Sequence, residues 1–136
     1  MLLVLAMFLL LVLAELLAIL AINDGHFMFA LDDPYIHLAL AENIWHGHYG
    51  VNVEEYAAPS SSILWPLLIA PLTVFPAADW LVLLLNIACA AMTLLFAGRS
   101  LQHLPPELAL SGKAQLLVLL LFMLATNLVG LSYIGM

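Results

Sequence analysis

Residues 32–65 read DDPYIHLALAENIWHGHYGVNVEEYAAPSSSILW and form the long polar segment of an otherwise apolar chain. The segment opens with two adjacent carboxylates, Asp32 and Asp33, directly after a hydrophobic stretch. Carboxylates beside a hydrophobic span are costly to place, so their presence favours a functional interpretation.

The composition indicates a membrane protein. The 136 residues are 66% hydrophobic and 8% charged, and the mean hydropathy is +1.16. A soluble domain of this length needs far more charge on its surface. The net charge of −7 argues against a nucleic-acid partner and against a polybasic anchor on anionic lipid. The single cysteine, Cys89, allows neither an internal disulfide nor a cysteine metal cluster.

Apolar segments predict the fold class, which is all-α with polytopic transmembrane helices. A bilayer core needs about 20 apolar residues in a helix. The first apolar segment, residues 1–22, lacks the basic start of a signal peptide, because no Lys or Arg precedes residue 99. The second apolar segment, residues 60–77, contains Pro66 and Pro71 and predicts a kinked span, with a re-entrant or interfacial segment as the alternative. The predicted spans are about 1–22, 60–77, 80–98 and 115–134, with an outer loop at 23–59.

The basic residues give a divided prediction of the orientation. Loop 23–59 has six acids and no Lys or Arg, so we expect it to be extracytoplasmic. Four spans would place Arg99 and Lys113 outside as well, whereas three spans would place them inside, as the positive-inside rule prefers. The chain stops at residues 131–136 without a polar flank, and we expect a truncated chain.

The outer loop predicts an amphipathic helix over residues 34–46. Asp33 and Pro34 are typical of an N-cap followed by the first helical residue, and Gly47 is a typical stop. Such a helix lies along the membrane surface, with Trp45 at headgroup depth. His37 follows Asp33 by one turn, so the two side chains can lean together. The predicted polar face comprises Tyr35, Ala39, Glu42, Asn43 and His46.

Several features recur together in this chain: Asp33 two before Tyr35, then Asn43, Gly47-His-Tyr-Gly50, Asn52, Ser60-Ser-Ser-Ile-Leu-Trp65 and the terminal Tyr133-Ile-Gly-Met136. In these features the loop resembles the first outer loop of the GT-C superfamily, integral-membrane glycosyltransferases that use polyprenyl-phosphate sugars. The resemblance covers about residues 25–70 and the last few residues, and it favours four spans. Several relatives carry an arginine within the helix, where this chain has Leu40, Ala41 and Glu42, so donor binding must differ or use residues beyond Met136.

The resemblance implies transfer of a sugar, with inversion, at the extracytoplasmic face of a bacterial plasma membrane. The acceptor hydroxyl loses a proton as the new bond forms, and a carboxylate can accept it as general base. We expect Asp33 to be this base and Asp32 to tune it through charge repulsion. Simple helix capping is the alternative role for Asp33, and capping of the next helix is the alternative for the serines. The expected substrate-binding residues are Tyr35, His37, Asn43, Ser61 and Ser62.

The expected partners are the lipid bilayer, a polyprenyl-phosphate-linked sugar and the remainder of a larger polytopic protein. Residues 1–136 alone are therefore expected to be inactive. Glu42 and His46 have a metal-ligand spacing without an obvious third ligand, and a weakly held Mg²⁺ or Mn²⁺ near Asp33 is the other metal hypothesis. Two further classes stay open. One is a non-catalytic accessory membrane protein that packs on a partner, and the other is a fragment of a transporter or channel.

Overall fold

The computed structural model describes residues 1–57, 59–60 and 62–134, and these residues form helices and connecting loops without a strand. The all-α class predicted from the sequence is confirmed for this part of the chain. The elements are α1 (Leu2–Ile22), α2 (Asp33–Trp45), α3 (Leu64–Ile69), the 3₁₀ turn η1 (Ala70–Leu72), α4 (Ala78–Gln102), the 3₁₀ turn η2 (Pro106–Leu108), α5 (Gly112–Ala125) and α6 (Leu128–Tyr133).

Two helices are long and apolar enough to cross a membrane. α1 has 21 residues and α4 has 25, which at about 1.5 Å per residue exceeds the roughly 30 Å of a bilayer core. Only 17% of the apolar window of α1 and 33% of that of α4 is buried, so most of these side chains face outward. The core helix of a soluble protein would instead be mostly buried. The two helices therefore indicate association with a membrane.

The apolar run at 115–134 is not one continuous helix. α5 ends at Ala125, and α6 begins at Leu128. Between them Asn127 has a left-handed backbone with φ of +46°, a conformation that asparagine tolerates better than most residues. The Thr126 hydroxyl donates to the Phe122 carbonyl at 2.8 Å at the end of α5. The predicted span thus consists of two shorter helices.

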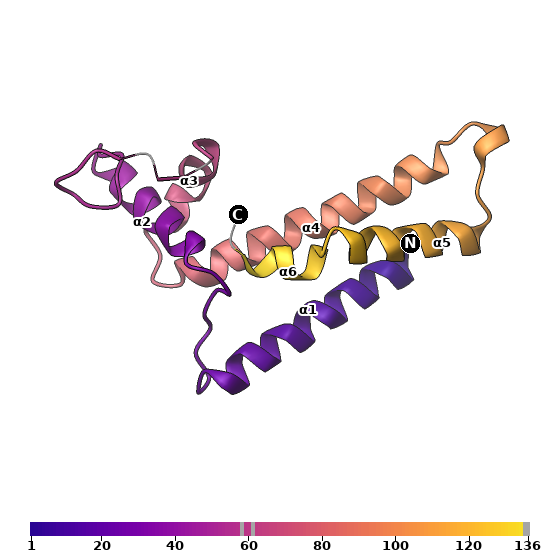
Figure 1. Cartoon of the computed structure of the whole chain (residues 1–136), viewed down its shortest axis with the longest axis horizontal. Helices are drawn as coiled ribbons and strands as arrows, with labels where there is room; N and C mark the ends of the chain where they lie inside the picture. The colour runs from indigo at the N-terminus through magenta and orange to yellow at the C-terminus, as the bar shows by residue number, and fades with distance from the viewer. Residues whose placement is uncertain (58, 61, 135–136) are drawn as a thin grey trace.

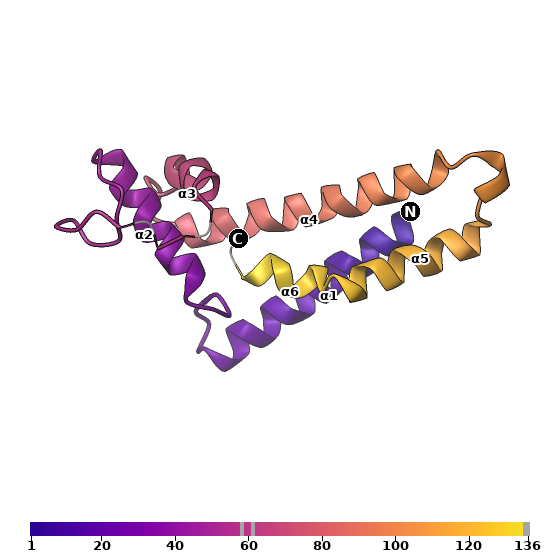
Figure 2. The ribbon, with the colours of Figure 1, turned by 45° about the horizontal axis from the view of Figure 1, so that its top comes forward.

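The apolar run at 60–77 also differs from a single kinked helix. It contains the six residues of α3 and the three of η1. Pro71 supplies no backbone N–H for an α-helical bond, which fits the tightening of the chain into a 3₁₀ turn. α3 and η1 pack on α2 beside one end of the long helices, as Figures 1 and 2 show.

The long helices place the two ends of the molecule far apart (Figure 1). At one end Gly98 of α4 lies so close to the Met1 side chain that an added Cβ would meet it. At the other end the Phe27 ring lies 4.9 Å from that of Trp80, and Ala30 N–H donates to the Tyr133 carbonyl at 3.3 Å. α2 and α3 are attached at this second end, opposite the connection between α4 and α5. Arg99 lies in the last turn of α4 and Lys113 at the start of α5, so both are at the end opposite the acidic loop.

Polar bonds between helices fix the packing of α6. The fully buried Tyr133 donates its phenolic hydrogen to the Val12 carbonyl of α1. The buried Asn86 of α4 donates to the Ser132 carbonyl at 3.5 Å. The apolar core around these bonds includes Val4, Phe8, Val82, Leu83, Leu94, Leu119 and Met123. α6 therefore anchors the end of the bundle that carries the acidic loop.

Candidate functional site

The start of α2 differs by one residue from the sequence prediction. The predicted helix 34–46 is found as Asp33–Trp45, with Asp32 at the N-cap position. Asp32 already has helical torsions, with φ of −81° and ψ of −24°, so the helix begins before Pro34. Neither carboxylate accepts a capping hydrogen bond, and both side chains are exposed. The N-cap position expected for Asp33 is therefore wrong, and its carboxylate is free of that role.

The end of α2 is held by Asn43. Its Nδ2 donates to the carbonyls of Gly50 at 2.7 Å and Val51 at 3.0 Å. Gly47 lies between them with φ of +70°, so it stops the helix as the sequence predicts. Both amide hydrogens of Asn43 are used in this turn, and only its oxygen is left to contact a substrate.

Tyr35 anchors the chain that leads into α2. Its hydroxyl oxygen accepts a hydrogen bond from Phe29 N–H at 3.1 Å. The two rings also meet edge to face, with centroids 5.7 Å apart. The sequence predicted a substrate contact for Tyr35, and the structure gives it a local partner that fixes the position of the acidic pair.

A cluster of polar side chains links α2 to the start of α3. His37 is only 4% exposed, and its Nδ1 lies 3.1 Å from Ser60 Oγ. Ser60 Oγ donates to the Ser62 carbonyl at 2.7 Å and accepts from Ser62 N–H at 3.1 Å. We call His37, Ser60 and Ser62 the serine–histidine cluster. Ser61, one of the predicted substrate-binding residues, lies outside the described residues.

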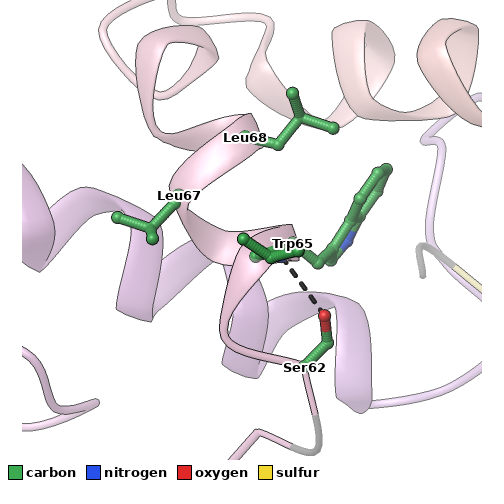
Figure 3. A pocket seen from close by; sticks show the side chains of 5 residues that line it. Ser62, Trp65, Leu67 and Leu68 are labelled. Carbon is green, nitrogen blue, oxygen red and sulfur yellow. Dashed lines mark hydrogen bonds between the residues drawn. The ribbon is translucent and has the colours of Figure 1, made fainter.

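Ser62 also supports the first turn of α3. Its Oγ accepts a hydrogen bond from Trp65 N–H at 3.2 Å, the bond drawn in Figure 3. This is the capping role that the sequence analysis left open for the serines. Sequence reasoning missed Ser60 as the direct partner of His37, because the run of three serines does not indicate which hydroxyl turns toward α2.

The hydrogen-bond pattern assigns the proton on His37. The single hydroxyl hydrogen of Ser60 is donated to the Ser62 carbonyl, so Ser60 Oγ acts as the acceptor toward His37. The hydrogen of the neutral imidazole then lies on Nδ1, and Nε2 carries a lone pair. Burial lowers the pKa of His37 below 6.5, and the negative charge of Asp33 opposes this in part. The ring is therefore neutral near pH 7.

An apolar groove adjoins this cluster. The groove has a volume of about 560 Å³ and is lined by Ser62, Leu64, Trp65, Leu67 and Leu68. Figure 3 shows Leu67 and Leu68 on α3, with Ser62 at the start of the helix. Leu64, Leu67 and Leu68 share one face of α3 and are exposed, which suits contact with an aliphatic chain. Ser62 belongs to both the polar cluster and the groove.

The described residues do not form a ligand set for either of the predicted metal sites. Within residues 1–57, 59–60 and 62–134, no three His, Cys, Asp or Glu side chains come together as a metal ion requires. Glu42 and His46 are both exposed on α2. The described side chains around Asp33 do not fit a divalent cation by themselves.

No protein-family model matches the sequence, and no curated protein or solved structure is detectably similar to the chain.

Proposed function

We propose that this chain supplies the first outer loop and neighbouring spans of a membrane glycosyltransferase. The enzyme moves a sugar from a polyprenyl-phosphate donor to an acceptor hydroxyl, with inversion. The supporting observation is the contact between a polar cluster one turn from Asp33 and an apolar groove on α3, through their shared residue Ser62. A donor with an aliphatic chain and a sugar needs both surfaces together.

Asp33 is the general base in this proposal. As the acceptor oxygen bonds to the anomeric carbon, its hydrogen passes to the carboxylate and the phosphate leaves with the bonding electrons. Asp33 is exposed and its side chain is not consumed by helix capping, which leaves its oxygens free for this role. Asp32 precedes it at the N-cap position and adds negative charge beside the base.

The proposed topology has three crossings. α1, α4 and the α5–α6 pair cross the membrane, and α2 and α3 lie on its extracytoplasmic surface. This arrangement takes the interfacial alternative for residues 60–77, because α3 and η1 together hold only nine helical residues. It is supported by Arg99 in the last turn of α4 and Lys113 at the start of α5, because these helix ends lie opposite the acidic loop, where the positive-inside rule favours basic residues.

Photo-labelling tests the proposed donor site. The chain is placed in lipid nanodiscs with a polyprenyl phosphate that carries a diazirine on its lipid, and labelled residues are mapped by mass spectrometry. We expect labels on residues 64–68, and we expect Leu67→Arg to abolish them by placing a charge in the groove. Leu108→Arg is the matched control, since Leu108 is also exposed but lies in η2.

Labelling that is absent, or that persists in Leu67→Arg, would contradict the donor site. A chain that also tolerates every substitution in the acidic loop would then fit the non-catalytic accessory protein.

A further inference from the structure

The second nitrogen of His37 is an unused hydrogen-bond acceptor. Its Nδ1 is bound to Ser60, and no hydrogen bond to Nε2 occurs within the described residues. Tyr49 Oη is the one fully buried side-chain polar atom without a partner in residues 1–57, 59–60 and 62–134. The His37 residue as a whole is 4% exposed, and Nε2 is not among these fully buried unpaired atoms.

The surroundings of Nε2 offer acceptors rather than positive charge. Asp33, one helical turn away, is the charged group that acts on His37. The elements that pack most closely on α2 are α3 and η1, and neither contains a titratable residue. Loop 23–59 has no Lys or Arg, and Asp32 and Glu42 add exposed negative charge.

We propose that His37 Nε2 accepts a hydrogen bond from a hydroxyl of an uncharged sugar, and that this part of the site binds sugar rather than phosphate. A sugar presents several O–H donors to the two acceptors, His37 Nε2 and the Asp33 carboxylate. A phosphate presents acceptor oxygens and negative charge, which the same groups repel. The inference rests on the proposed function, since it assigns the sugar of that reaction to α2.

The first test is the tautomer of His37. The chain is labelled with ¹⁵N-histidine in nanodiscs, and His37→Gln identifies the resonances of this ring among the five histidines. We expect the hydrogen on Nδ1 in the native protein and in Ser60→Thr, which keeps the hydroxyl. Ser60→Ala should lose this preference. His26→Gln is the control, because His26 is exposed outside the cluster. A native ring with its hydrogen on Nε2 overturns the proposal.

The second test is direct binding. A panel of short-chain alkyl glycosides and an alkyl phosphate of the same chain length are titrated while the Nε2 resonance of His37 is followed. We expect at least one glycoside to move this resonance to saturation and the alkyl phosphate to leave it in place. Ser60→Ala should weaken glycoside binding about tenfold, the effect of losing one well-oriented hydrogen bond, and Ser60→Thr should restore it.

The proposal is overturned if the alkyl phosphate shifts the Nε2 resonance of His37. It is also overturned if none of the glycosides shifts this resonance. These readouts need no transfer reaction. Sugar binding without photo-labelling at α3 would therefore refute the polyprenyl donor site while leaving the role of His37 intact.

Discussion

Asp32 and Asp33 are adjacent and exposed, but only Asp33 is followed one turn later by His37. In the complete enzyme we expect Asp33→Asn to lower sugar transfer by about 10²–10⁴, the usual cost of losing a general base. Asp32→Asn should cost much less. The measurement is transfer from a matched polyprenyl-phosphate sugar in membranes with equal amounts of each variant. A dead Asp32→Asn beside an active Asp33→Asn would exchange the two assignments.

The charge of Asp33 has a second measurable effect. Burial lowers the pKa of His37, and the Asp33 carboxylate raises it in part. Asp33→Asn removes the opposing charge, so the pKa of His37 should fall further. An NMR titration of the His37 ring measures this change, with Glu42→Gln as the control on the exposed face of the same helix. An unchanged pKa in Asp33→Asn would show that the carboxylate does not act on the ring.

The same residue should make the stability depend on pH. Because the pKa of His37 is lower in the folded chain, the unfolded chain takes up its proton first as the pH falls through about 6.5. The stabilisation is complete above this pH and decreases as the pH falls toward the pKa of the folded state. We expect the thermal midpoint to fall over this range in the native chain and to fall less in His37→Gln. His26→Gln should behave as the native protein, and an unchanged slope in His37→Gln would argue against the buried neutral ring.

At the scale of elements, Asn43 joins the end of α2 to the loop that follows it. Asn43→Ala removes hydrogen bonds to the Gly50 and Val51 carbonyls. The expected loss is about 1–3 kcal/mol, from about 0.5–1.5 kcal/mol for each bond. Amide hydrogen exchange should accelerate in residues 46–57 and change little in α4. Glu42→Ala, which changes an exposed neighbour, is the control, and equal exchange in both variants would remove Asn43 from this role.

The whole molecule places the acidic loop at one end of the bundle and the α4–α5 connection at the other. In a Cys89→Ala background, we expect Glu54→Cys to react with an impermeant thiol reagent in intact cells. His103→Cys, at the far end of α4, should react only after lysis. The reverse labelling pattern would invert the orientation. Labelling of both cysteines in intact cells would restore the four-span arrangement.

The sequence by itself determined the features that depend on neighbouring residues. The apolar run of α1 predicts a long helix, since leucine and alanine favour helix and 21 residues satisfy their own backbone bonds. Asp33-Pro34 and Gly47 located α2 to within one residue, because backbone torsions at helix ends depend on local chemistry. The acidic pair and the histidine one turn later follow from the same helical period.

Only the tertiary structure decided which distant groups meet. Ser60 and His37 are 23 residues apart, and Tyr133 and Val12 are 121 apart. Asn127 divides the apolar run at 115–134, and Pro71 lies where the run at 60–77 changes from α3 to η1, whereas their composition predicts continuous spans. The choice of hydroxyl for His37, and of α3 as a short helix packed on α2, depends on how the helices pack. A local sequence pattern leaves many such pairings open. The packed tertiary structure selects one of them, because most buried polar groups need hydrogen-bond partners.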